Sequence, residues 1–256
     1  MKYRYQKSSK KVFLAIFIFG VIIGNLITYY YFTNYSQIKS ETQTTQSNYV
    51  FKEPVYSHVE LNLVAVDQKG NGVSTPLIVE AKPGNGKALT NVDKLLFWVD
   101  TQYSIQVAKL VAENVTKINA SNYDLFYSIE TNASVIGGPS AGAALTIATI
   151  AALKNEKIRN DVVITGTIEE DGTIGEVGGV LEKAKAAKDV GAKLFLVPKG
   201  QGEQTFLKPE ENCIRRANFV FCETVYKQVT VNIGEDAGIS VIEVSNIEEA
   251  YKYFKI

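Results

Sequence analysis

The sequence predicts an α+β domain, because segments with strand and helix patterns mix without a strict strand–helix–strand repeat. Two observations support this prediction: alternating apolar and polar residues mark the strands, and apolar residues three or four positions apart mark the helices. Residues 199–237 contain short apolar runs that fit neither pattern. The expected strands are residues 58–66, 75–83, 123–130, 161–168, 193–198 and 239–244. The expected helices are residues 92–117, 140–154, 180–190 and 246–255.

The first two expected strands form a predicted hairpin. HVELNLVAV (58–66) alternates apolar and polar residues, and TPLIVEAKP (75–83) is a second strand-like run. Glycines 70 and 72 lie between them and favour a turn. The helix predicted over residues 92–117 follows, with its apolar residues on roughly one face.

The later elements follow turn signals in the sequence. SAGAALTIATIAALK (140–154) is typical of a buried helix of small residues, and it comes after a glycine-rich turn. DVVITGTI (161–168) fits a strand. VLEKAKAAKDV (180–190) fits a helix that Gly191 ends. ISVIEV (239–244) predicts the last strand, which a short helix follows.

The composition argues against two classes of partner. The chain has 27 basic and 27 acidic residues, so its formal net charge is zero. Nucleic-acid phosphates attract clustered Lys and Arg, and this balance therefore gives no reason to expect nucleic acid. The sequence contains no cluster of Cys, His and carboxylate residues with the spacing of metal ligands. We expect neither a metal nor another cofactor.

The N-terminal 32 residues have the pattern of a membrane anchor. Residues 1–11 contain five basic residues and no acid, and residues 12–32 contain no charged residue. About 20 apolar residues cross a bilayer core as a helix, and the basic flank stays in the cytoplasm. We therefore expect a single-pass transmembrane helix, a cytoplasmic N-terminus and an extracytoplasmic domain. A cleaved signal peptide is the alternative, although TYYYFTNYS (28–36) is bulky for a cleavage site.

The rest of the chain divides into a linker and a domain. Residues 33–56 are rich in Thr, Ser and Gln, which predicts a flexible tether. Residues 57–256 are expected to form the folded domain. Its two cysteines, Cys213 and Cys222, either form a disulfide outside the cytoplasm or act as two small apolar side chains.

GGPSAG (137–142) is the segment that most clearly suggests a catalytic function. Pro139 suits a helix start, because the N–H that it lacks would have no partner there. Ser140 then lies in the first helical turn, where unpaired backbone N–H groups and the helix dipole can hold an oxyanion. Ser140 is therefore a candidate nucleophile, although a serine at this position is more often only a helix cap.

A serine nucleophile needs a general base. The only histidine, His58, has no clear acidic partner, so a Ser-His-Asp triad has little support, and a lysine is the other route. A lysine accepts a proton only when neutral, so burial must lower its pKa from about 10.4 to about 7–8. Helix 180–190 carries three lysines, of which Lys183 lies one turn from the apolar Val180 and Ala187. This periodicity favours Lys183 slightly.

Two motifs at a set spacing resemble the Lon protease family. GGPSAG (137–142) resembles the family's nucleophile motif, in which Gly-Pro-Ser-Ala-Gly holds the catalytic serine. Residues 165–198 resemble the segment that runs from a Thr-Gly pair through Gly-Gly to the catalytic lysine. The lysine after Gly-Gly is Lys183, and its separation of 43 positions from Ser140 matches the family's usual spacing. Residues 76–87 also resemble the family's early hairpin.

The resemblance implies a role for each matching residue. Ser140 would be the nucleophile and Lys183 the general base. Thr165 would form a hydrogen bond with the lysine and orient it, and the backbone N–H groups of Gly138 and Ser140 would form the oxyanion hole. The resemblance also implies a Lon protease-like proteolytic fold, polypeptide substrates and self-association into a homo-oligomer.

This sequence departs from the family pattern at several places. Gly137 stands where many Lon proteases carry Asp, and Phe126 and Ser128 stand where bacterial members carry His. Residues 199–237 look longer than their family counterpart. GNGKA (84–88) lacks the spacing and the hydroxyl of a nucleotide-binding loop, so we expect no ATP hydrolysis by these residues.

The sequence therefore predicts an ATP-independent serine endopeptidase that cleaves unfolded or flexible polypeptides outside the cytoplasm. The alternative is a non-catalytic binding or scaffold module that keeps a Lon-like fold. The missing acid at position 137 and the missing histidines suggest this alternative. Both candidate catalytic residues are present, however, which favours the enzyme.

Overall fold

The computed structural model describes most of residues 55–256 and a few residues before them. The basic segment 1–11, most of the expected anchor and the expected tether up to residue 54 lie outside the described residues. No helix in the described part of the chain is long and apolar enough to cross a membrane. The described residues are 23–26, 28–30, 55–91, 96–97, 99–129, 135–136, 138–216 and 219–256.

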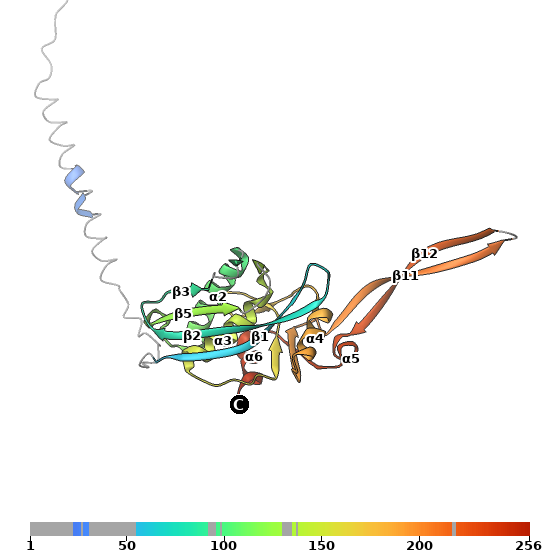
Figure 1. Ribbon diagram of the computed structural model, residues 1–256. Coiled ribbons are helices and arrows are strands. Elements are labelled where there is room, and N and C mark those ends of the chain that lie inside the picture. The colour runs from blue at the N-terminus through green and yellow to red at the C-terminus, as the bar shows by residue number, and fades with distance from the viewer. Residues whose placement is uncertain are drawn as a thin grey trace, which may run out of the picture. The chain divides into compact units, whose positions relative to one another are not determined.

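The chain divides into two compact units, Met1–Asn48 and Tyr49–Ile256. The second unit contains two clusters of buried apolar side chains. Because it has its own core, we expect this unit to fold without the first 48 residues. Its helices and strands mix along the chain (Figure 1), which confirms the prediction of an α+β fold.

A four-stranded sheet forms one layer of the second unit (Figure 1). β1 (Ser57–Val66) and β2 (Gly72–Pro83) pair antiparallel, which confirms the expected hairpin. β2 also pairs antiparallel with β5 (Tyr123–Ile129), and β5 pairs parallel with the short strand β3 (Ala88–Thr90). Alternate residues of β2 and β5 are buried, because successive side chains point to opposite faces and one face meets the helices.

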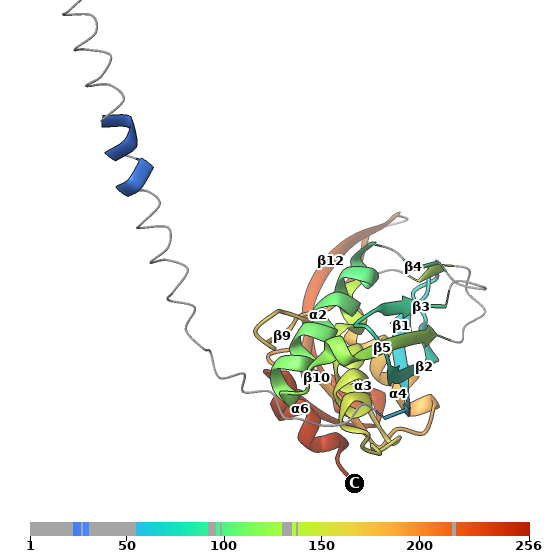
Figure 2. The same ribbon diagram turned by 90° about the vertical axis from the view of Figure 1, so that its left-hand side faces the viewer.

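Helix α3 (Gly142–Lys154) is the centre of the larger core. It packs against β1, β2 and α2 (Val99–Thr116), and every residue before its last is buried. The sequence of α3 has no polar face, so this helix is stable only inside the domain. α6 (Ile247–Phe254) also contacts α3, and Figure 2 shows α2, α3 and α6 side by side. The helix expected over residues 92–117 is wrong at its start, because residues 96–97 form the short strand β4 (Leu96–Phe97) and α2 begins only at Val99. The other expected helices are confirmed, with α3 beginning two residues later than expected.

A second, three-stranded sheet is parallel. β10 (Leu194–Pro198) lies between β7 (Val162–Ile164) and β13 (Ser240–Val244). α4 (Val180–Asp189) packs both against β10 and against the β1–β2 hairpin. The smaller apolar cluster fills the space around α4. This arrangement buries one face of α4, which is the helix that carries Lys183.

The prediction of one strand over residues 161–168 is wrong. β7 ends at Ile164, and a separate short strand, β8 (Thr167–Ile168), pairs antiparallel with β9 (Ile174–Gly175). Gly166 between β7 and β8 has φ +156°, and a Cβ there would lie 2.4 Å from a side-chain carbon of β9. Only glycine fits this close approach, so the chain changes direction here.

Residues 199–237, which fit neither the strand nor the helix pattern in the sequence, contain the longest hairpin of the described chain. β11 (Glu203–Arg216) and β12 (Phe219–Asn232) have 14 residues each and pair antiparallel. The hairpin leaves the domain beside α5 (Ile233–Ala237) and extends away from the two sheets (Figure 1). Cys213 and Cys222 form a disulfide across it, which settles the question that the sequence left open.

Four short elements remain, and one of them contains Ser140. This element, η2, lies directly before α3 and contacts α2, β1 and β8. β4 and β6 pair parallel. The four elements are η1 (Ala120–Asn122), η2 (Pro139–Ala141), β4 (Leu96–Phe97) and β6 (Val135–Ile136).

Candidate active site

Ser140 lies in η2, a single 3₁₀ turn that leads into α3. The sequence placed Ser140 in the first turn of the helix itself, but the regular α-helix begins only at Gly142. Gly138 precedes the turn with φ +102°, which glycine adopts without steric strain. Pro139 occupies the first position of the turn, where a backbone N–H would have no partner. Ser140 is half-buried and therefore partly accessible to a substrate.

Hydrogen bonds hold the Ser140 turn against the break between β7 and β8. The N–H of Gly166 donates to the Ser140 carbonyl at 3.1 Å, and Ala143 N donates to the Gly166 carbonyl at 3.0 Å. Thr165 Oγ1 also donates to the Ser140 carbonyl, at 3.3 Å. Gly142 permits this contact, because a Cβ at its position would lie 2.9 Å from a backbone nitrogen of β8. The interrupted strand therefore fixes the backbone of the candidate nucleophile.

Lys183 lies on the buried face of α4. Its exposed fraction is 4%, and the neighbouring Val180 and Ala184 are buried in the same apolar cluster. Lys185, two positions later, has a side chain that is 51% exposed and pairs with Asp236 at 3.1 Å. The prediction that Lys183 faces inward, unlike the other lysines of this helix, is confirmed.

Burial lowers the pKa of Lys183 from 10.5 to about 8. No ion pair between described residues includes Lys183. Without a counter-ion, the loss of hydration destabilises the ammonium form relative to the neutral amine. A lysine with a pKa near 8 accepts protons near neutral pH, which is what a general base requires.

The elements that carry Ser140 and Lys183 both pack against β1. η2, α4 and β7 each contact this strand, and Thr165 directly follows β7. In this structure the Ser140 hydroxyl and the Lys183 amine, both of them described, are not hydrogen-bonded to one another. The Thr165 hydroxyl donates to the Ser140 carbonyl, so its role in orienting Lys183 stays a prediction.

The backbone N–H of Gly138, expected in the oxyanion hole, already has a partner. It donates to Asp100 Oδ2 at 2.9 Å, while Asp100 Oδ1 accepts from Thr101 N at 2.8 Å. A carboxylate at this position competes with an oxyanion for the N–H and repels its charge. Gly138 can therefore serve an oxyanion hole only after Asp100 moves away. Gly137, the position where the family often has an acid, lies outside the described residues.

Asp100 is the residue of this site that sequence reasoning missed. Asp100 lies in the first turn of α2, where an acid interacts favourably with the helix dipole, but the sequence predicted this helix from residue 92 and so placed Asp100 in its interior. Its contact with Gly138 spans 38 positions of the chain and depends on the packing of α2 against η2. A pattern confined to one helix cannot reveal such a contact.

His58 lies far from Ser140, which excludes a serine–histidine pair. Its neighbour Ser57 donates through Oγ to the Ala152 carbonyl at 2.6 Å, near the C-terminal end of α3. Ser140 precedes the opposite end of this helix. The 11 residues of α3 from Gly142 to Ala152 correspond to roughly 16 Å at about 1.5 Å per residue. Lys183 is therefore the better candidate for the general base.

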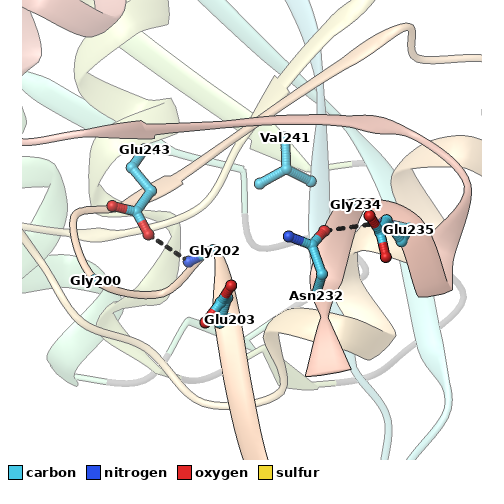
Figure 3. Close-up of a pocket in the computed structure, with 8 residues that line it drawn as sticks. All are labelled: Gly200, Gly202, Glu203, Asn232, Gly234, Glu235, Val241 and Glu243. Atoms are coloured by element: carbon cyan, nitrogen blue, oxygen red, sulfur yellow. Dashed lines mark hydrogen bonds between the residues drawn. The ribbon is translucent and has the colours of Figure 1, made fainter. Parts of the chain in front are cut away.

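A hollow of about 550 Å³ lies at the base of the β11–β12 hairpin (Figure 3). The Glu243 carboxylate in this hollow accepts a hydrogen bond from Gly202 N at 2.7 Å. In the same turn, Gln201 makes two hydrogen bonds with the backbone of Val177, at 3.0 and 2.8 Å. None of the candidate catalytic residues lines the hollow. The hydrogen bonds of Gln201 fix the hairpin base to the segment before α4. The hollow is separate from the candidate dyad.

Comparisons with known proteins give matches to Lon proteases. Residues 95–233 match the family described as Lon protease (S16) C-terminal proteolytic domain. The Archaeal Lon protease of Thermococcus kodakarensis is 27% identical over 158 residues, which cover 59% of this chain and 24% of that protein. The Lon protease of Fervidobacterium nodosum is 28% identical over 165 residues, 63% of this chain and 20% of that protein.

A eukaryotic relative is similar to this chain to about the same extent. The peroxisomal Lon protease homolog 2 of Caenorhabditis elegans is 30% identical over 156 residues, 59% of this chain and 19% of that protein. The chain thus spans about a fifth to a quarter of the length of these relatives. The family match covers more than half of the chain and includes Ser140, Thr165 and Lys183. The chain therefore belongs to the family of Lon protease (S16) C-terminal proteolytic domains.

Proposed function

We propose that this chain is a serine endopeptidase that cleaves unfolded or flexible polypeptides with a Ser140–Lys183 dyad and without ATP. Membership of the Lon proteolytic family supports peptidase activity. The observation that carries the finer proposal is the buried amine of Lys183, whose pKa is lowered to about 8. The sequence contains no G-x-x-x-x-G-K-[ST] loop that would bind a nucleotide.

In the proposed mechanism, neutral Lys183 takes the proton from Ser140 Oγ as this oxygen attacks the substrate carbonyl. After Asp100 moves away from the Gly138 N–H, backbone N–H groups of Ser140 and Gly138 hold the resulting oxyanion at the N-terminal end of α3, where the helix dipole favours negative charge. Protonated Lys183 then donates to the leaving amine. Water hydrolyses the acyl-enzyme, with the lysine again as base. Thr165 orients Lys183 in this proposal.

We propose further that a transmembrane helix over residues 12–32 anchors the domain outside the cytoplasm. The five basic residues before this segment support a cytoplasmic N-terminus. The Cys213–Cys222 disulfide supports an oxidising compartment for the domain, because disulfides are rare in the cytosol. Resemblance to the family also supports self-association into a homo-oligomer.

A non-catalytic binding or scaffold module is the alternative. Two observations favour it: Ser140 and Lys183 are not hydrogen-bonded to one another, and the Gly138 N–H is occupied by Asp100. Catalytic hydrogen bonds often form only when substrate binds, however, so an unbound geometry does not exclude the enzyme.

An assay with an unfolded protein tests the proposed function. Residues 49–256, which form a compact unit, are expected to cleave a denatured, fluorescently labelled protein equally well with and without ATP. The same protein in its native state should be cut much more slowly, because residues 49–256 contain no nucleotide-binding loop that could drive unfolding. If no cleavage occurs at any pH between 6 and about 10, the scaffold alternative replaces the proposal.

Replacing Asp100 by asparagine should raise peptidase activity. The change removes the negative charge beside the Gly138 N–H but keeps a side chain of the same shape. The amide oxygen of asparagine still accepts from an N–H, but without the negative charge it holds the Gly138 N–H less tightly and no longer repels the oxyanion. We therefore expect kcat to rise by about ten-fold, which is a fraction of the effect of one oxyanion donor. Steady-state kinetics with a labelled peptide measure the change.

Glu113→Gln provides the matched control for this variant. Glu113 lies near the other end of α2. Its replacement by glutamine therefore removes one acid from the same helix without changing a contact of the Ser140 turn. Its kcat should equal that of the wild type. A kcat for Asp100→Asn at or below the control value would show that Asp100 supports the loop rather than blocks it.

A further inference from the structure

The β11–β12 hairpin ends in apolar side chains on both of its faces. On one face Ile214 lies opposite Phe221, and on the other face Arg215 lies opposite Val220. The four apolar side chains at this end are each 60–69% exposed. We call the following residues the hairpin tip: Ile214, Arg215, Arg216, Phe219, Val220 and Phe221.

The charges of the tip differ from those of the rest of the hairpin. The tip carries two arginines, and the sequence between Glu211 and Glu223 contains no acid. The remainder, which we call the shaft, carries both signs, and Lys227 and Glu210 form an ion pair across its strands. The disulfide joins the strands where the shaft meets the tip. The shaft charges are Glu203, Lys208, Glu210, Glu211, Glu223 and Lys227.

The placement of apolar groups on both faces limits what can cover the tip. A protein that packs beside the hairpin, or a second copy that adds a strand along its edge, covers one face or one edge. Such a partner would leave either Val220 or the pair of Phe219 and Phe221 in water. A medium that the hairpin enters end-on covers both faces together. The apolar interior of a bilayer is such a medium.

The arginines fit the boundary between lipid and water. Long basic side chains bury their apolar stems and keep their charged ends at the level of the headgroups. Arg216 lies opposite Phe219 in the outermost described pair and Arg215 lies opposite Val220, so an end-on insertion carries both arginines in beside the apolar side chains. Their long stems must then reach back along the hairpin to keep the charged ends at the headgroups, one on each face. Each basic residue near an anionic leaflet strengthens binding through electrostatic attraction, and added salt weakens this attraction.

We propose that the hairpin tip is a membrane-binding element that inserts end-on into the surface of a bilayer containing anionic lipid. Each strand has 14 residues, so the hairpin is roughly 45 Å long at about 3.3 Å per residue. The shaft, which carries charges of both signs, stays in water and holds the domain away from the lipid. This inference uses the proposed anchor only as the reason that a bilayer is nearby, and its test does not depend on the anchor.

Sedimentation with vesicles tests the proposal on residues 49–256, which lack the expected anchor. The protein should pellet with vesicles of phosphatidylcholine mixed with phosphatidylglycerol, and less with phosphatidylcholine alone. Added salt should weaken the first interaction. The double variant Phe219→Ser/Phe221→Ser should bind at least about ten-fold more weakly to both vesicle types, because it removes two large apolar groups.

The matched control places the same change on the shaft. Leu207→Ser/Tyr226→Ser removes two apolar side chains with exposed fractions of 67% and 65%, similar to those of the tip, and should bind vesicles as the wild type does. Arg215→Gln/Arg216→Gln should lose the preference for anionic vesicles and keep the weaker binding to neutral ones. Peptidase activity in solution should be equal in all these variants, because none is in the candidate active site.

Three outcomes overturn the proposal. The first is wild-type vesicle binding by the Phe219→Ser/Phe221→Ser variant. The second is an equal loss in the shaft control, which would indicate general adsorption of the hairpin. The third is that the tip variant turns a lipid-free oligomer into a monomer, measured by light scattering, while no form of the protein binds vesicles. That result would assign the tip to contacts between copies of this chain.

Discussion

Alanine at position 140 is expected to lower kcat by roughly a thousand-fold or more, because the attacking oxygen is lost. The variant should also fail to react with a fluorophosphonate probe, which labels activated serines. The fold should be unchanged, since the turn is held through the Ser140 carbonyl, which alanine keeps. Mass spectrometry of the labelled protein and steady-state kinetics measure both effects.

Ser121→Ala is the control for this prediction. Ser121 is exposed in η1, and its change should affect neither labelling nor turnover. Full probe labelling of the Ser140→Ala variant would refute the nucleophile assignment. If neither the wild type nor the variants are labelled, the scaffold alternative gains support.

The second large effect concerns Lys183 and pH. Because burial lowers the pKa of Lys183 to about 8, kcat/KM of the wild type should rise with pH and level off above about 8. The rise reflects the growing fraction of neutral amine, which alone accepts the serine proton. Lys183→Met should abolish activity at every pH, whereas Lys185→Met, which changes an exposed lysine of the same helix, should keep the wild-type profile.

A flat pH profile would contradict the role of Lys183 as base. The serine-reactive probe gives an independent measurement, because labelling of the wild type should follow the same rise with pH. Labelling of the Lys183→Met variant at the wild-type rate would likewise remove Lys183 from the mechanism.

The same pKa shift predicts a change in stability that activity does not report. The pKa of Lys183 is about 8 when folded and near 10.5 when unfolded, so the unfolded chain binds more protons between these values. Stability of the wild type should therefore rise with pH from about 8 to about 10.5. Below pH 8 the buried charge costs up to about 3 kcal/mol relative to a neutral side chain.

Lys183→Met should consequently be more stable than the wild type at pH 7, with the gap closing above pH 10.5. Urea unfolding of residues 49–256 at several pH values measures the difference. Equal stability at pH 7 would mean that the charged amine is solvated in the folded protein. A residue that is both costly for stability and required for turnover would fit a functional role better than a structural one.

Local patterns predict most elements of this domain. The β1–β2 hairpin and helix α4 follow from short-range periodicity, and their bounds differ from the expected ones by three residues at most. The break at Gly166 was not predicted, because DVVITGTI (161–168) has a continuous strand-like composition. The chain turns there to meet the Ser140 turn, and this contact joins residues far apart in the sequence.

The long hairpin escaped prediction for a related reason. A strand that packs on a core alternates apolar and polar residues, but β11 and β12 pack mainly on each other and are exposed on both faces. No burial requirement imposes the alternation from which strands are recognised. Apolar residues are exposed along both strands, and only the paired register shows that Ile214, Phe219, Val220 and Phe221 share one end.

The sequence by itself determined the candidate chemistry: a Gly-Pro-Ser-Ala-Gly motif at Ser140, and a lysine 43 positions later that follows Gly-Gly. These are local in the chain, so they can be recognised without a fold. Only the tertiary structure decided which lysine is neutral enough to act, because the pKa of Lys183 depends on the strands that bury α4. It also placed Asp100 at the Gly138 N–H, since that contact requires α2 to pack against the Ser140 turn.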